Sequence, residues 1–285
     1  MVEFAYDREV RPAASHRLFN ISDGDTPTIL QPVRMVSIDT PEKSHYAGKA
    51  ETAQPKLDRC RQLLLDGVYP AIPDDLRDYL VDRLDPEAAA RHIDAGEQAT
   101  IQFDLLLRER LTRADGSQRT VATVPTGEVI DRYGRMLAYL APWFTGSKSD
   151  PLPPRDDPRR RTLNLDMIAG GWAASFLIYP SLPHDADLNL LLDDARTAWR
   201  QRRGAWKKHG RKLLLGYEYR LAIKLGTEKP PAKAMADAFQ RVCVDLRSGR
   251  SVGLFGWSKV PPPERLWFWV DDTAKATVDL GLDPA

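Results

Sequence analysis

The chain has 285 residues, of which 42% are hydrophobic and 28% are charged. This balance excludes collagen-like, coiled-coil and wholly disordered classes of protein. Its 41 Lys and Arg residues nearly balance its 40 Asp and Glu residues, so the net charge of +1 indicates no class of partner and only the distribution of charge along the chain can do so.

The spacing of apolar residues predicts a mixture of short strands and helices, punctuated by proline-rich loops. In chain order we expect strands at residues 18–21, 28–30 and 33–38, helices at 51–66 and 73–84, strands at 99–111, 120–124 and 136–140, helices at 163–168, 187–208 and 231–246, and strands at 251–257 and 266–270. The strand at 33–38 alternates only partly between apolar and polar residues, which indicates that it is covered on both faces.

Charge is distributed unevenly. Residues 66–97 are strongly acidic, whereas residues 196–224 carry ten basic residues and a single acid, Glu218. Such a basic block is typical of a solvated helix face, and it also attracts polyanions such as nucleic acids. Trp199 and Trp206 lie within the block at a spacing that favours core packing over base stacking.

The residues suited to catalysis are concentrated in three segments: DGDT at 23–26, RMVSIDTPE at 34–42 and DRYGR at 131–135. Asp25 and Asp39 each lie at the end of a predicted strand, and pairing of those strands would bring the carboxylates within ~5 Å, where they need a shared cation. Glu42 would then be a spare acid beside that cation. Arg34 and Arg135 carry planar, permanently charged groups suited to phosphate.

Each segment alone also has a plainer interpretation. DGDT and YGR are typical turn sequences, and an isolated arginine such as Arg34 is usually a surface ion pair. The combination in this order is more specific, because a metal, a spare carboxylate and two arginines suit attack on a phosphodiester.

In this order the three segments resemble the motifs of the staphylococcal nuclease (thermonuclease) family, which reads DGDT, R-x4-DTPE and D-[KR]-YGR-x-LAY. The resemblance covers roughly residues 16–209. It implies that Asp25, Asp39 and the carbonyl oxygen of Thr40 bind Ca²⁺ and that Glu42 is the general base. The catalytic residues that it implies are Arg34, Glu42 and Arg135.

The same resemblance implies a nucleotide pocket. Tyr133 falls where the family contacts the nucleotide, and Arg132 is its neighbour in the motif. The family's second active-site tyrosine falls on Leu177 by ungapped count, and Tyr179 follows two residues later. We therefore expect Tyr133, Arg132 and Tyr179 to bind substrate.

For the fold, the resemblance implies an α+β class built on a five-stranded OB-type β-barrel with packed helices. We expect a nuclease domain at residues 1–209, with inserts at about 67–97 and 104–128. Residues 210–285 have no counterpart in the family, and we expect them to form a small α/β extension.

The sequence therefore predicts a calcium-dependent nuclease that hydrolyses phosphodiester bonds of DNA and/or RNA. The alternative is a non-catalytic module of the same family that binds nucleic acid or protein, and the C-terminal extension is a further possible contact for a protein partner. We expect no membrane association and a cytoplasmic location, because the charged N-terminus lacks the apolar core of a signal peptide and no uncharged run reaches membrane-spanning length. Two distant cysteines, Cys60 and Cys243, argue against disulfides and a structural zinc.

Overall fold

A computed structural model describes residues 17–131 and 133–282 of the chain. Its strands are β1 (Arg17–Asp23), β2 (Thr26–Leu30), β3 (Val33–Met35), β4 (Ser37–Asp39), β5 (Val121–Ile130), β6 (Met136–Pro142), β7 (Ala174–Ile178), β8 (Arg241–Asp245), β9 (Arg250–Gly253) and β10 (Arg265–Trp269). Its α-helices are α1 (Ala50–Leu65), α2 (Asp74–Arg83), α3 (Ala88–Leu111), α4 (Leu163–Ala169), α5 (Asp185–Arg200), α6 (Ala205–His209), α7 (Gly216–Leu225), α8 (Pro231–Ala238) and α9 (Thr273–Asp279).

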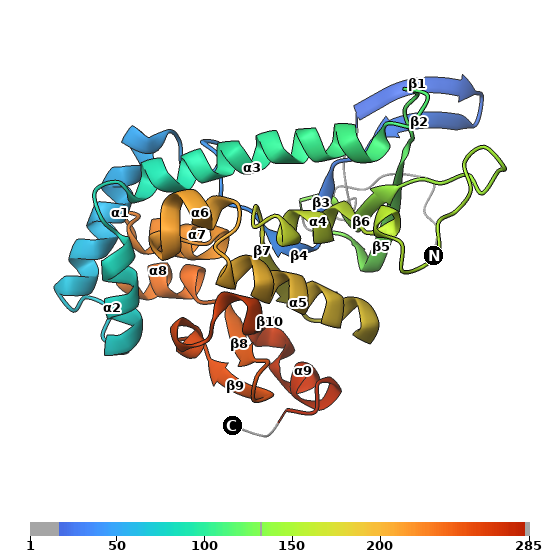
Figure 1. Ribbon diagram of the computed structural model, residues 1–285. Helices are drawn as coiled ribbons and strands as arrows, with labels where there is room; N and C mark the ends of the chain where they lie inside the picture. Colours follow the sequence, from blue (N-terminus) through green and yellow to red (C-terminus); the bar gives the residue numbers. More distant parts are fainter. Residues whose placement is uncertain (1–16, 132, 283–285) are drawn as a thin grey trace.

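The strands form three separate sheets (Figure 1). The largest has the order β4-β7-β10-β8-β9, so its strands come from both ends of the sequence. A second sheet has the order β3-β6-β5, and β1 pairs only with β2 in a hairpin. Figure 1 shows this hairpin at one end of the molecule and α1 with α2 at the opposite end, with the long α3 running between them.

The predicted five-stranded OB-type barrel is wrong, because the described strands form open sheets and none of the three closes. A break within the segment 33–38, for which the sequence predicts one strand, explains much of the difference between the predicted barrel and the observed open sheets. Ser37 has a φ of 61°, which divides that segment into β3 and β4. β3 then pairs in parallel with β6, whereas β4 pairs antiparallel with β7.

The C-terminal strands also prevent closure. β10 pairs in parallel with β7 and antiparallel with β8, so the ladder continues into the C-terminal segment. Residues 241–269 therefore extend the main sheet instead of forming a separate small α/β extension. The hydrophobic cores likewise contain residues from both sides of position 209, including Phe176 and Trp267 in one core. The proposed domain division at residue 209 stays a prediction.

The segment at 99–111 is helical, although its β-branched and aromatic residues predicted a strand. It forms the second half of α3, in which Ala99, Phe103 and Leu106 pack against the second core at helical spacing. Tertiary packing of this face overrides the local preference for a strand. The predicted insert at 67–97 supplies α2 and the first half of α3, and its leucines lie in the main core.

Two other predicted helices are shorter than expected. The helix predicted at 187–208 is divided into α5 and α6, because Gly204 between them has a φ of 54° and a Cβ there would come within 2.5 Å of the carbonyl oxygen of Gly170. The helix predicted at 231–246 ends at Ala238, and β8 follows it to pair with β10. Cys60 and Cys243 are buried free thiols.

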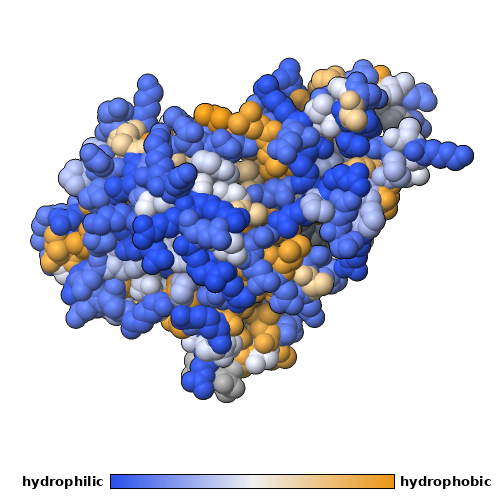
Figure 2. All heavy atoms as spheres, in the orientation of Figure 1, coloured by the Kyte–Doolittle hydropathy of each residue, from blue (hydrophilic) through white to orange (hydrophobic). Residues whose placement is uncertain are grey.

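The face seen in Figure 2 is largely hydrophilic, with apolar patches that include one over α3. Ile101 and Leu105 of α3 are among the exposed apolar residues, each about half accessible. Within the described part of the chain, no helix is both long and apolar enough to cross a lipid bilayer.

Candidate active site

The end of β4 is where two of the predicted site residues meet. Asp39 is buried at this end and pairs with Ala174 of β7. Arg34 of β3 reaches it from five residues away, and its Nη2 donates a hydrogen bond of 3.1 Å to Asp39 Oδ1. The break at Ser37 separates the two strands, so that the arginine of one can reach the last carboxylate of the other.

Glu42 follows in the loop after β4, and its backbone is held by α3. The amide N–H of Glu42 donates to Nε2 of His92 at 2.8 Å, and His92 Nδ1 lies 3.0 Å from the carbonyl oxygen of Leu214. His92 is therefore neutral, with its proton on Nδ1, and burial lowers its pKa to about 3. Gly96 makes this packing possible, because a Cβ there would lie 2.5 Å from the Glu42 carbonyl oxygen.

A third arginine, which the motifs did not identify, binds both carboxylates. Arg220 of α7 donates through Nη2 to Asp39 Oδ1 and Oδ2, at 3.1 and 2.9 Å, and through Nη1 to Glu42 Oε1. We call Asp39 and Glu42 together the acid pair. The sequence analysis placed Arg220 only within the basic block, and no local motif marks it, because 181 residues separate it from Asp39.

The first residue of α7 packs directly against the acid pair. A Cβ on Gly216 would lie 2.5 Å from Asp39 Oδ2 and 2.6 Å from the carbonyl oxygen of Thr40. Only glycine therefore lets α7 approach closely enough for Arg220 to reach the carboxylates. Thr40, the third predicted calcium ligand, has its carbonyl oxygen covered by this helix.

The charges at this point determine the protonation of Asp39. Burial by itself would raise the pKa of the Asp39 carboxyl, but the guanidinium groups of Arg220 and Arg34 outweigh burial and hold the pKa below its usual value. Asp39 is thus a carboxylate at neutral pH. Its side chain is 1% exposed, whereas that of Glu42 is 27% exposed, so Glu42 is the more accessible member of the acid pair.

The predicted nucleotide-binding turn directly precedes β6, whose Met136 and Leu137 pair with Val33 and Arg34 of β3. The turn therefore lies at the same end of that sheet as Arg34. Tyr133 is 67% exposed, and the guanidinium carbon of Arg135 lies 5.3 Å from the centre of its ring.

The guanidinium of Arg135 is oriented by a neighbouring acid. Its Nη2 lies 2.6 Å from Asp131 Oδ2, and its side chain remains 38% exposed. Arg135 is therefore charged, positioned and accessible to an anion from solvent. Arg132, also predicted to bind substrate, lies outside the described residues.

Asp25 is not brought to this site. It lies in the turn of the β1–β2 hairpin, where its Oδ1 accepts a hydrogen bond of 3.1 Å from the Thr26 hydroxyl. Every residue of both strands is exposed, and Figure 1 shows the turn at the outer end of the hairpin, well away from β4. The expected convergence of Asp25 and Asp39 is therefore not found, because the hairpin pairs with neither of the other sheets.

Tyr179 and Leu177 also lie apart from the acid pair. Tyr179 follows the far end of β7, five residues from the Ala174 that pairs with Asp39, or about 16 Å along an extended strand. Its hydroxyl bonds Asp279 and Lys275 of α9. Leu177 is fully buried in the second core.

The arrangement described here does not fit a calcium ion. Asp39 has both oxygens bonded to guanidinium groups, Glu42 is bonded to the same Arg220, and Asp25 is elsewhere. Across residues 17–131 and 133–282 no three His, Cys, Asp or Glu side chains form a group that could hold a metal. The calcium prediction stays a prediction for experiment.

Chemically, the site combines a deeply buried carboxylate, an accessible carboxylate and several arginines. It can bind an anion through the exposed parts of Arg34 and Arg135 and can hold a water molecule at Glu42. No protein-family model matches the chain, and no curated protein matches it either. The resemblance to thermonucleases therefore depends on the motifs alone.

Proposed function

We propose that the chain hydrolyses phosphodiester bonds of DNA and/or RNA, with its active site at the acid pair. The observation that supports this most is that Arg34 bonds Asp39 at the end of β4, while Arg220 joins Asp39 to Glu42. The resemblance to thermonucleases assigns Arg34 to phosphate binding, Glu42 to catalysis and Asp39 to metal binding.

The proposed roles follow from charge and accessibility. Glu42 orients or deprotonates the attacking water, since its carboxylate is the reachable one of the acid pair. Arg34 and Arg135 stabilise negative charge on the phosphate oxygens, because their side chains are about one third exposed. Asp39 fixes Arg34 in place through its hydrogen bond. No step is assigned to a metal ion, because the described donor set does not fit one.

The alternative is a module that binds nucleic acid without cleaving it. It is favoured by one specific observation, the neutralisation of both carboxylates by Arg220. In that case Arg34, Arg135 and the basic block would contact phosphates, and Glu42 would have a structural role.

A digestion assay separates the two functions. The full chain would be incubated with labelled single-stranded DNA, double-stranded DNA and RNA, with Ca²⁺ and with a chelator. We expect cleavage of at least one polymer, and we expect Arg34→Gln to reduce turnover by about 10²–10³-fold through loss of a charge stabiliser. Arg59→Gln is the matched control, because Arg59 forms an exposed ion pair with Glu228 on the surface. Binding without cleavage under every ion condition would contradict the proposal and support the alternative.

A further inference from the structure

The acid pair has a counter-ion supplied by the chain itself. One guanidinium, that of Arg220, bonds three carboxylate oxygens of Asp39 and Glu42. Because hard divalent ions bind through carboxylate oxygen, a cation bound between these two residues needs an oxygen of Asp39, and Arg220 bonds both of them. Arg220 and such an ion therefore cannot both occupy this position.

Arg220 is delivered to this position by a firmly anchored helix. Almost every residue of α7 is buried, and Gly216 packs against Asp39. Glu218, two residues before Arg220, bonds the backbone N–H of Leu215 and the guanidinium of Arg265. Because the helix backbone is fixed in this way, only the Arg220 side chain can leave the acid pair without unfolding of α7.

The balance of charge around the acid pair also indicates that Arg220 takes the place of a bound cation. The two carboxylates of the acid pair face the two guanidinium groups of Arg34 and Arg220, so the cluster has no net charge. Removing the charge of Arg220 leaves one uncompensated negative charge in a largely buried place, where electrostatic attraction for a cation is much stronger than in water.

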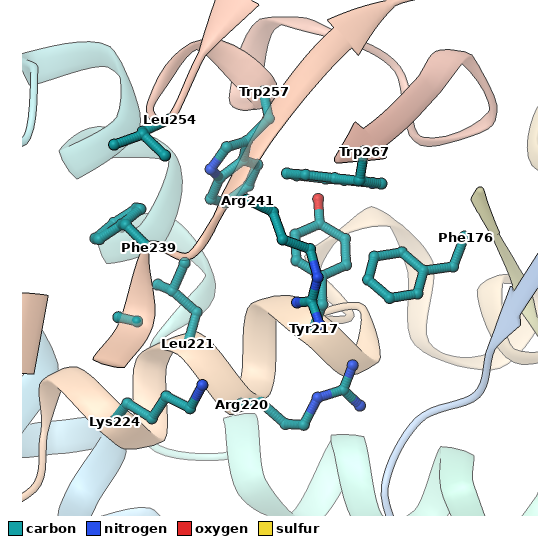
Figure 3. Close-up of a pocket in the computed structure, with 11 residues that line it drawn as sticks. Phe176, Tyr217, Arg220, Leu221, Lys224, Phe239, Arg241, Leu254, Trp257 and Trp267 are labelled. Atoms are coloured by element: carbon teal, nitrogen blue, oxygen red, sulfur yellow. The ribbon is translucent and has the colours of Figure 1, made fainter. Parts of the chain in front are cut away.

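A small pocket lies on the side of Arg220 that faces away from the acid pair, and the Arg220 side chain would have to move toward it to release the two carboxylates. The pocket leaves about 40 Å³ open to the centres of water molecules, room for about three waters. Its walls include Tyr217, Phe176 and Arg241, and Figure 3 shows the guanidinium ends of Arg241 and Arg220 directed toward one another. Like charges repel, so the attraction that holds Arg220 comes from the acid pair and not from the pocket.

We propose that Arg220 competes with divalent cations for Asp39 and Glu42 and keeps the acid pair closed to them. The inference goes beyond the proposed function, which assigns no step to a metal ion, because it makes one residue of the C-terminal segment keep cations from the acid pair. It predicts that the wild-type chain binds Ca²⁺ weakly at the acid pair and that loss of the Arg220 charge opens it.

The test measures cation binding without nucleic acid. Binding of Ca²⁺ by calorimetry, and of Tb³⁺ by luminescence, would be compared for the wild-type chain and Arg220→Gln. We expect at least about tenfold tighter binding by the variant, since a full positive charge is removed beside the acid pair. Arg196→Gln is the matched control, because Arg196 also forms a two-bond pair with one carboxylate, that of Glu264, and its loss should leave affinity unchanged.

Two further variants keep the inference falsifiable. Adding Asp39→Asn to Arg220→Gln should abolish the gain if the cation binds the acid pair. Arg220→Lys keeps the positive charge but cannot bond both carboxylates as the planar guanidinium does, so its Ca²⁺ affinity should lie between those of the wild-type chain and Arg220→Gln. This variant also replaces Arg220→Gln if that variant fails to fold. Equal affinities for the wild-type chain and both Arg220 variants would overturn the inference. A gain in affinity by a chain that cleaves no polymer would leave the inference standing and contradict the nuclease proposal instead.

Discussion

Helix α7 contributes to two ion-pair clusters, one through Glu218 and one through Arg220 two residues later, and the two clusters differ in what surrounds them. Glu218 and Arg265 have side chains that are 0% and 2% exposed. Glu218 also accepts hydrogen bonds from Tyr79 and Tyr217 at Oε1 and from the backbone of Leu215 at Oε2, so both of its oxygens are bonded within the protein.

The cluster around Arg220 is only partly enclosed, because Glu42 is 27% exposed. Arg34, which bonds Asp39 in this cluster, is itself about one third exposed, whereas aromatic rings enclose the other cluster. The two clusters therefore differ in burial and not in chemistry: the same pairing of arginine and carboxylate is fully enclosed around Glu218 and partly accessible to solvent around Arg220.

The largest effect on stability is expected from Arg265. Arg265→Met leaves Glu218 as an uncompensated buried charge, which typically costs about 3–5 kcal/mol of unfolding free energy. Arg220→Gln should cost clearly less, because Glu42 can reach solvent and Asp39 keeps Arg34. Urea unfolding of both variants measures the difference, and equal losses would show that the two clusters are not distinct in the way that we describe.

The next effect is a pH dependence from His92. Its folded-state pKa, about 3, lies below the ordinary value of 6.5, so the unfolded chain binds the extra proton between these values. Stability is thus present in full above pH 6.5 and is lost as pH falls toward 3. At pH 5 the loss is about 2 kcal/mol relative to neutral pH. Urea unfolding at pH 7 and pH 5 measures it, and His92→Gln should remove this part of the slope; an unchanged slope would contradict the assignment.

Gly216→Ala tests the close approach of α7 to the acid pair. A methyl group there meets Asp39 and the Thr40 carbonyl at about 2.5 Å, and such overpacking usually costs about 1–3 kcal/mol. Gly127→Ala is the matched control, because the surroundings of Gly127 are open and its φ is not positive. Thermal unfolding of both alanine variants compares them, and equal effects would argue against a steric role for Gly216.

The smallest effect is expected from the basic block. Lys208 pairs with Asp94 at 2.7 Å and Lys212 with Asp82 at 3.0 Å, so part of this block is neutralised by the acidic stretch. If the remainder contacts phosphates, charge reversal at Arg200, Arg203 and Lys207 should flatten the dependence of log K on log salt by about 0.7 per lost contact for single strands. Affinity for a long strand across a salt series measures this, and identical slopes would mean that the block serves solubility or another partner.

The residues of the candidate site were partly predictable from the sequence. Arg34, Asp39 and Glu42 lie within nine residues, so the short motif that contains them also determines that they meet. Arg220 could not be predicted, because its position depends on the packing of α7 against β4 across most of the chain. The predicted position of Asp25 beside Asp39 failed for the same reason, because the DGDT motif does not determine which sheet its hairpin joins.

The fold was less predictable than the site. Ser37 divides a segment whose sequence predicts one strand, and Gly204 divides a segment whose sequence predicts one helix. Both residues have a positive φ, which the local pattern of apolar residues does not reveal. The pairing of β7 with β10 likewise joins strands nearly ninety residues apart, which local patterns do not encode.

Glu42 provides the most direct test of the central claim, that the acid pair is an active site. Glu42→Gln keeps the shape of the side chain and removes the charge that would activate water, so turnover of single-stranded DNA should fall by about 10²–10⁴-fold. The unfolding free energy and the affinity for a nucleotide should change little, because the loop is held through the Glu42 backbone and His92. Turnover that stays within a few-fold of the wild-type value would contradict the account.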